Sequence, residues 1–140
     1  MLLVVVASIV SGCASTRQYV KFPDQSVGLE DPAKARIYVA RPTAFGGAVT
    51  MKVSDGDVLI GKTGPKGYLC WERNPGEMTL IGKAENADIE KISIQQGYVY
   101  YFEQKVKMGF LMARNDIKQV EGEEGRKIVS KCKSPKIETE

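Results

Sequence analysis

The chain has 140 residues, a net charge of +3 and no histidine. This length suits one domain whose core needs neither a metal nor many disulfides. Lys/Arg and Asp/Glu are interspersed, so the block of positive charge typical of a nucleic-acid-binding protein is missing. Without histidine, Ser-His-Asp and Cys-His catalysis and histidine-ligated zinc are excluded. We therefore expect no nucleic-acid partner, no cofactor and no enzymatic activity.

The first twelve residues carry no charged side chain. The apolar run at residues 2–10 is about half as long as a membrane-spanning helix requires, which favours a signal-peptide core at residues 1–12. The sequence VSGC at residues 10–13 resembles the lipobox of bacterial lipoproteins, although no Lys or Arg precedes the apolar run. The resemblance implies that Cys13 is the first mature residue and is lipidated. The alternative is a buried N-terminal strand with a core cysteine.

An anchor of two or three acyl chains on Cys13 would be effectively permanent, since each buried methylene contributes about 0.8 kcal/mol. In lipoproteins of double-membrane bacteria, Asp directly after the lipidated cysteine retains the protein at the inner membrane. Ala14 stands there in this chain. The resemblance therefore implies an outer-membrane protein facing the periplasm, with the membrane and an envelope protein as expected partners.

Residues 13–34 are polar, contain two prolines and show no sustained hydrophobic period. Such a segment is typical of a flexible tether between a membrane anchor and a domain. Val20 and Phe22 offer an alternative, in which the segment docks on the domain as an edge.

From Ala35 onward, short apolar and aromatic runs alternate with turn residues such as Asp55-Gly56 and Asn74-Pro75-Gly76. About seven short antiparallel strands at this spacing predict an all-β sandwich over residues 35–133. The predicted strands cover residues 36–41, 49–54, 58–62, 68–73, 77–84, 89–94 and 98–102, with 109–113 as a further candidate.

A short amphipathic helix is predicted over residues 123–133. Gly125, Ile128, Val129 and Cys132 form one uncharged stripe, with acidic residues in the first turn and lysines in the last. We expect this helix to close over the sheet and the tail at 134–140 to be loose.

The sequence GDVLIGKT at residues 56–63 matches the phosphate-loop pattern. A phosphate loop requires a buried strand before it and a helix after it. Here strand-forming residues fill positions 58–60, and Gly64-Pro65 follows where a helix would start. The glycine at 56 is instead explained by a type I′ hairpin turn. We therefore predict a hairpin and no nucleotide binding.

Cys70 and Cys132 leave two interpretations open. In an oxidising periplasm they would bridge strand to helix, and closing a loop of about 60 residues would contribute roughly 4 kcal/mol. Otherwise they are two buried free thiols. Two cysteines without histidine fall short of the four ligands of a structural zinc site, so no metal is expected.

Three carboxylates and one aromatic run are the remaining candidates for a site. A glycan hydrolase would need two of Asp55, Asp57 and Glu72 in one cleft, about 5 to 9 Å apart. Alternation along residues 98–102 sends Tyr98, Tyr100 and Phe102 to one face and Val99 and Tyr101 to the other. For this aromatic run, packing in the core is favoured. The alternative is a binding platform that would also include Trp71.

The sequence ARIYVARP at residues 35–42 is similar to the opening signature of small bacterial lipoproteins catalogued as domain of unknown function 2846. The same family is indicated by IGK at 60–62 after the hairpin glycine, NPGE at 74–77, QGYVYY at 96–101 and EEGR at 123–126. The resemblance covers roughly residues 35–132. It implies a secreted, usually lipid-anchored, all-β domain without an established activity.

The leading hypothesis is a lipid-anchored envelope protein whose sandwich binds another component or supports an assembly. A carboxylate-based cell-wall or glycan hydrolase is one alternative. A small inhibitor or exclusion lipoprotein is the other.

Overall fold

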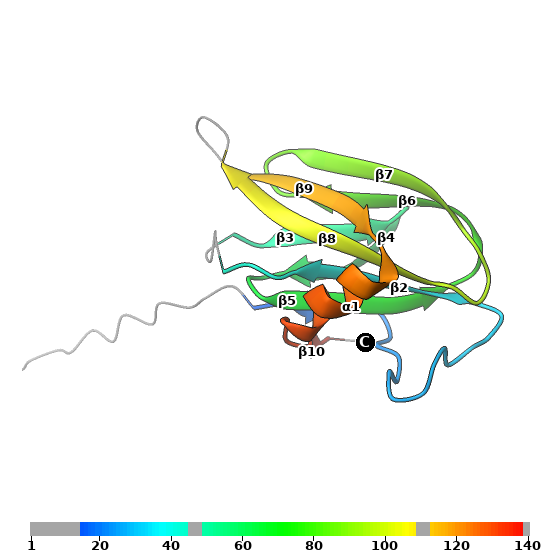
Figure 1. Ribbon diagram of the computed structural model, residues 1–140. Helices are drawn as coiled ribbons and strands as arrows, with labels where there is room; N and C mark the ends of the chain where they lie inside the picture. Colours follow the sequence, from blue (N-terminus) through cyan, green and yellow to red (C-terminus); the bar gives the residue numbers. More distant parts are fainter. Residues whose placement is uncertain (1–14, 45–48, 109–112, 139–140) are drawn as a thin grey trace, which may run out of the picture.

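The computed structural model describes residues 15–44, 49–108 and 113–138. The fold is an all-β sandwich of two mixed sheets with one short helix (Figure 1). The elements are β1 (Arg17–Gln18), β2 (Ala35–Arg41), β3 (Met51–Asp55), β4 (Val58–Thr63), β5 (Gly67–Arg73), β6 (Gly76–Lys83), β7 (Ala87–Ile94), β8 (Val99–Met108), β9 (Ala113–Val120), α1 (Gly122–Ser130) and β10 (Lys136–Ile137).

Sheet A has the strand order β10-β1-β4-β3-β6-β7, and sheet B has the order β5-β2-β8-β9. Alternating side chains of both sheets point inward and form one apolar core. Each large aliphatic side chain in it contributes about 1.5–3 kcal/mol by leaving water. The core residues are Ala35, Ile37, Val39, Val53, Ile60, Leu69, Trp71, Met78, Leu80, Ile94, Phe102 and Ile117.

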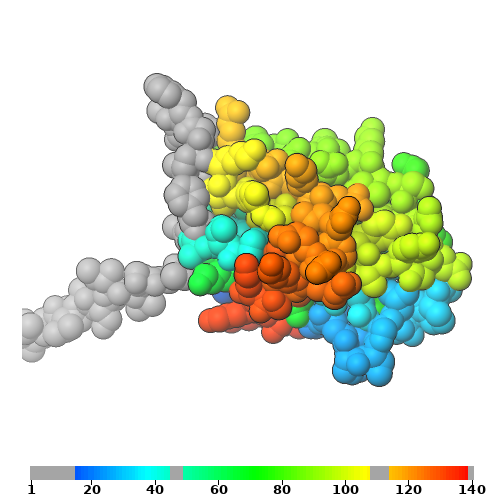
Figure 2. Space-filling view, in the orientation of Figure 1, coloured from blue at the N-terminus to red at the C-terminus, as the bar shows by residue number. Residues whose placement is uncertain are grey.

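Strand β2 is buried on both faces, because the outer face of sheet B is covered as well. Helix α1 packs there against Tyr101, which stacks on Tyr38 with a centroid distance of 5.0 Å. The segment before β2 adds Phe22, whose ring lies 6.0 Å from that of Tyr68. Figure 2 shows both covering pieces on the surface, α1 in orange and the segment before β2 in blue. Sheet B is therefore the middle layer of the molecule.

The expectation of purely antiparallel strands is corrected. β2 and β8 run parallel, with Ile37 opposite Tyr100, and β1 runs parallel to β10. A hairpin can join only antiparallel neighbours, whereas parallel neighbours need a longer connection. Here the chain leaves sheet B after β5, builds β6 and β7 in sheet A, and returns as β8.

Two described segments close to the termini, β1 and β10, take part in sheet A, whereas residues 13–34 were predicted as a tether and residues 134–140 as a loose tail. Backbone groups of β1 pair with Lys62 and Gly61 of β4, and β10 adds to β1. The side-chain amide of Gln18 also donates to the Cys70 carbonyl at 2.7 Å and accepts from its N–H at 3.0 Å. A Cβ at Gly61 would collide with the backbone of β1. Strand formation here depends on these distant partners.

The phosphate-loop sequence is a hairpin, as predicted. Its central residues are Gly56 and Asp57 rather than Asp55 and Gly56, since Asp55 pairs with Val58. Gly56, with φ +56°, stands at the first central position, where type II′ turns take glycine. The remainder of the pattern is β4.

Two later elements differ from the expected boundaries. The candidate strand at 109–113 falls mostly on residues 109–112, outside the described residues, and the observed strand β9 begins at Ala113. Helix α1 ends at Ser130, so Gly125 and Ile128 are its buried residues and Cys132 lies beyond it. In the part of the chain that the structure describes, no helix has the length and apolar character needed to cross a membrane.

Candidate functional site

A cleft of about 380 Å³ opens between the two sheets, where the end of β5 faces the β3–β4 hairpin. We call it the inter-sheet cleft. It combines apolar residues of the core margin with charged and amide groups. Its lining residues are Val20, Lys21, Asp55, Val58, Ile60, Trp71, Glu72, Arg73 and Asn74. The size suits a small polar ligand or one side chain of a partner.

Asp55 is held from two sides by β5. The indole Nε1 of Trp71 donates to Asp55 Oδ2 at 3.1 Å, and Arg73 Nη1 donates to Oδ1 at 2.8 Å. Trp71 itself is 3% exposed, so its ring belongs to the core. The hydrogen bond to Asp55 supplies the partner that a buried indole N–H requires. The Asp55 carboxylate thus fixes the hairpin against β5.

Glu72, which also lines the cleft, forms a buried ion pair with Arg36. The two side chains are 8% and 5% exposed, and Arg36 Nη2 donates to Glu72 Oε2 at 3.0 Å. The backbone N–H groups of Glu30 and Asp31 each donate to the same carboxylate at 3.1 Å. Burial raises the pKa of Glu72, but these hydrogen bonds outweigh burial and hold the pKa below its usual value. Glu72 is therefore an ionised carboxylate that ties down residues 30–31.

The guanidinium of Arg36 extends this cluster into the segment before β2. Its Nη2 also donates to the carbonyl oxygens of Gly28 at 2.6 Å and Asp24 at 3.0 Å. Arg36 and Glu72 thus shape residues 24–31 over the outer face of sheet B. Arg36 and Arg73 were not among the predicted site residues, since an arginine in a strand gives no sequence signal of its partner.

Two of the three candidate carboxylates, Asp55 and Glu72, line the inter-sheet cleft, whereas Asp57 is exposed at the hairpin tip. General acid catalysis by a glycosidase requires a carboxyl group whose pKa is raised so that it carries a proton. The pKa of Glu72 is lowered. This is the opposite of the shift that a general acid requires.

The family model described as protein of unknown function (DUF2846) matches residues 31–117. The matched part runs from just before β2 into β9 and includes most residues of the inter-sheet cleft. The chain belongs to this family. The EEGR sequence at 123–126, which we counted toward the resemblance, lies beyond the matched residues.

This DUF2846 chain also resembles an uncharacterized protein of Haemophilus influenzae (strain ATCC 51907 / DSM 11121 / KW20 / Rd). The two are 27% identical over 131 residues, which cover 90% of this chain and 77% of the relative. The alignment therefore extends beyond the matched domain.

The aromatic run of the DUF2846 domain packs largely as core. Phe102 is 1% exposed and Tyr100 packs against the core, while Tyr101 faces the covered outer side of sheet B. Tyr98, 59% exposed, precedes β8. Core packing, favoured over a binding platform, is confirmed for Tyr100 and Phe102.

Cys70 of the DUF2846 domain and Cys132, which lies beyond the matched residues, are free thiols. Burial raises the pKa of Cys70 to about 12 and that of Cys132 to about 11. Since the thiolate is the reactive form, neither side chain has the environment of a reactive cysteine. Cys13 lies outside the described residues. Within the described ranges, no group of three metal-binding side chains gathers.

Polar residues that sequence analysis did not single out tie the two sheets together at the end opposite the cleft. Gln104 of β8 accepts from Thr63 Oγ1 at 2.5 Å and donates to Asn115 Oδ1 at 2.6 Å. Asn115 Nδ2 then donates to the Gly82 carbonyl at 3.0 Å. Both buried amide side chains have hydrogen-bond partners. This series of hydrogen bonds is therefore a structural link between β8, β9 and sheet A.

Proposed function

We propose that the protein is a lipid-anchored component of the bacterial envelope, whose sandwich acts by binding and not by catalysis. The observation that carries this proposal is the distance in sequence between Cys13 and the fold. β1 begins at Arg17, four residues after the cysteine of the VSGC sequence. A lipid on Cys13 would hold sheet A within about 14 Å of the bilayer, because an extended chain spans at most about 3.5 Å per residue.

The firm attachment of β1 supports this arrangement. Tyr19 N–H donates to the Ile60 carbonyl at 2.9 Å, and Lys136 N–H donates to the Thr16 carbonyl at 2.9 Å. A pull on Cys13 would thus be transmitted to sheet A and not to a slack linker. With Ala14 after the cysteine, the proposed location is the outer membrane, facing the periplasm.

A binding role for the inter-sheet cleft is supported by its donors. The lining combines Lys21, Arg73 and Asn74 with the buried apolar residues Ile60 and Trp71. Within the chain, Lys21 is paired with Glu30 and Arg73 with Asp55. Such a site suits an acidic or amide-bearing group of another envelope component. Asp55 and Glu72 in one cleft are the observation that favours the second candidate, a glycan hydrolase. That candidate requires turnover that is lost in both Asp55→Asn and Glu72→Gln.

The test is intact-mass spectrometry of the chain purified from its native membranes. We expect a protein that starts at Cys13, carries diacylglyceryl and N-acyl masses and enters the detergent phase of a two-phase partition. The matched control is Cys13→Ser, which should keep its leader and carry no acyl mass. A native product that retains Met1 and stays in the aqueous phase would overturn the proposal.

A further inference from the structure

Five cationic residues form one row across the outer face of sheet A. Arg17 is the Cα partner of both Lys136 and Lys62, and Lys52 is the partner of both Lys62 and Lys83. Directly paired residues on neighbouring strands project to the same face. The row therefore crosses five adjacent strands in the order β10, β1, β4, β3, β6. We call Lys136, Arg17, Lys62, Lys52 and Lys83 the basic row.

The basic row is unfavourable for the isolated domain, because like charges directly opposite each other repel. Arg17 is paired with Glu138. Among the described residues, no carboxylate lies within salt-bridge distance of Lys52, Lys62 or Lys83. These three lysines line a hollow of about 440 Å³. The one carboxylate in its lining is Glu85. Among the described residues, Lys52, Lys62 and Lys83 thus present positive charge without a salt-bridge partner.

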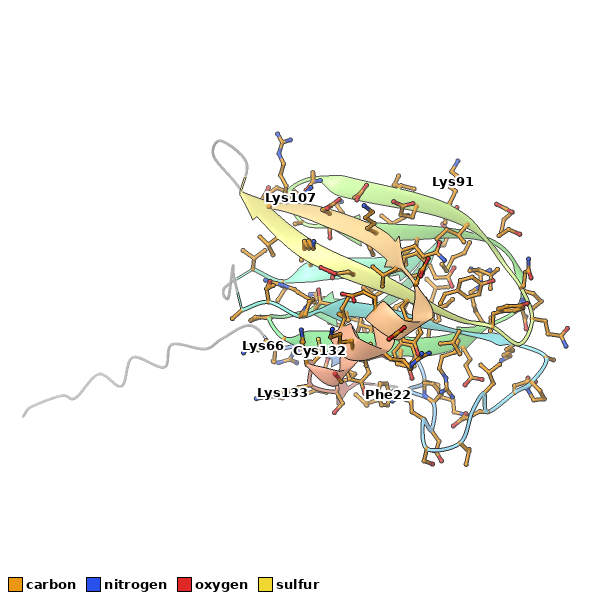
Figure 3. All side chains as sticks on the ribbon, in the orientation of Figure 1. Phe22, Lys66, Lys91, Lys107, Cys132 and Lys133 are labelled. Atoms are coloured by element: carbon orange, nitrogen blue, oxygen red, sulfur yellow. The ribbon has the colours of Figure 1, made fainter. Side chains whose placement is uncertain are left out.

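The basic row lies at the end of sheet A where the chain enters the fold. Arg17 is the first residue of β1, and Lys83 is the last residue of β6. Lys66 and Lys133 lie at the same end, where Lys133 N–H donates to the Lys66 carbonyl at 2.7 Å (Figure 3). Acidic residues gather at the other end of the same sheet, with Asp57 in the β3–β4 turn and Glu77 near the start of β6. Glu138, paired with Arg17, and Glu85, in the lining of the hollow, also lie at the basic end, but the basic side chains outnumber them. This end of the sheet is the one nearest Cys13 in sequence.

We propose that the basic row docks on an anionic phospholipid surface, which orients the sandwich with this end against the bilayer. This inference rests on the proposed anchoring through Cys13. At about 4.8 Å between strands, the row is about 19 Å long. That length spans several lipid headgroups, whereas one small anion would engage only the three lysines of the hollow. Because Arg17 lies only four residues after Cys13, the proposed anchor brings the positively charged row close to the anionic bilayer surface.

The test is a vesicle-binding measurement with the full chain carrying Cys13→Ser, so that no covalent lipid contributes. We expect it to bind vesicles of phosphatidylglycerol and phosphatidylcholine more tightly than vesicles of phosphatidylcholine alone. Changing Lys52, Lys62 and Lys83 together to Gln should weaken binding to the anionic vesicles roughly 100-fold, since each basic residue near an anionic surface contributes about a factor of five. About 0.5 M salt should have a similar effect through screening.

The matched control changes Lys118, Lys127 and Lys131 to Gln, which removes the same charge from exposed positions in β9 and around α1. This control should keep most of the anionic binding. If both triple variants lose equal affinity, net charge and not the row is responsible, and the proposal is wrong. If inorganic phosphate competes where sodium chloride of equal ionic strength does not, the lysines form a site for a free anion, which also overturns it.

The two proposals fail separately. A native protein without acyl chains whose unlipidated form still needs the basic row for vesicle binding would overturn the anchor alone. An acylated protein whose row variant binds vesicles like its control would overturn the docking alone.

Discussion

The two sheets carry charged groups in opposite circumstances. On sheet B, Arg36 and Glu72 are buried beneath residues 24–31, and each finds several hydrogen-bond partners. On sheet A, Lys52 is exposed, and both of its cross-strand partners, Lys62 and Lys83, are also lysines. A buried ion pair that the fold satisfies is costly to break by removing one partner, whereas exposed like charges set opposite each other repel and favour an external counter-charge. This contrast separates the structural cluster of the molecule from its proposed docking face.

Removal of the Glu72 carboxylate is expected to have the largest effect. Glu72→Ala would leave the Arg36 guanidinium buried without its counter-ion, and the free energy of unfolding should fall by about 3–5 kcal/mol. Urea unfolding followed by the fluorescence of Trp71, the single tryptophan, measures this loss. The double variant Arg36→Met with Glu72→Leu should recover much of it, because no unpaired charge remains. A loss in Glu72→Ala as small as that in exposed Glu85→Ala would show that the pair is not structural.

Acid should weaken the same contact by a smaller amount. Burial raises the pKa of Glu72, but hydrogen bonds from Asp31, Glu30 and Arg36 outweigh it, so the folded pKa lies below the usual 4.5. The stabilisation is therefore complete above about pH 4.5 and is lost as the pH falls through the folded pKa. The urea midpoint should drop on going from about pH 5 to about pH 3, more steeply than in Glu72→Gln. Asp24 and Glu30 also have lowered pKa values, so only the difference between the two curves reports on Glu72. Parallel curves would contradict the assignment.

The cover over sheet B can be loosened without touching a charge. A Cβ at Gly125 of α1 would overlap the ring of Tyr101, so Gly125→Ala should lower the free energy of unfolding by about 1–3 kcal/mol. Gly122→Ala is the matched control in the same helix, since its Cβ would meet only the Arg126 guanidinium at 3.3 Å. That control should be neutral or stabilising by up to about 1 kcal/mol, as alanine favours helix. Equal losses in both would mean that α1 does not pack on Tyr101.

The strands in which apolar and polar residues alternate clearly were predictable from the sequence. β9 shows why a strand without that pattern was not. In β9 the inward residues include Asn115, whose amide is satisfied by Gln104 and Gly82, so only Ile117 gives an apolar signal in the middle of the strand. A buried amide in a strand looks like a loop residue until its partners are known. β1 and β10 were missed for a related reason, since two-residue strands carry no period at all.

The candidate site was predictable only in part. Asp55 and Glu72 were named from the sequence, and both line the inter-sheet cleft. Their partners were not predictable, because Arg73 reaches Asp55 across the sandwich and Arg36 reaches Glu72 from a neighbouring strand. The basic row is likewise invisible in sequence, since its members are spread from position 17 to position 136 and only the register aligns them.

The smallest expected effect concerns the row itself and has the opposite sign. Lys52→Glu replaces two repulsive cross-strand pairs, with Lys62 and Lys83, by attractive ones. The free energy of unfolding should therefore rise by about 0.2–1 kcal/mol at low salt. The gain should disappear near 1 M salt, where the screening length is about 3 Å. Lys91→Glu is the matched control in the same sheet, where Figure 3 labels Lys91. The cross-strand partner of Lys91 in β7 is the uncharged Thr79.

Urea unfolding of both variants at low and high salt would decide this prediction. If Lys52→Glu is no more stable than Lys91→Glu, the lysines of the row do not measurably repel each other. The proposed difference between satisfied charges on sheet B and repelling charges on sheet A is then wrong. If it is more stable and also binds anionic vesicles less tightly, the same residue weakens the fold and strengthens docking. The presence of a lysine at position 52 is then explained by the anionic surface that it contacts outside the chain.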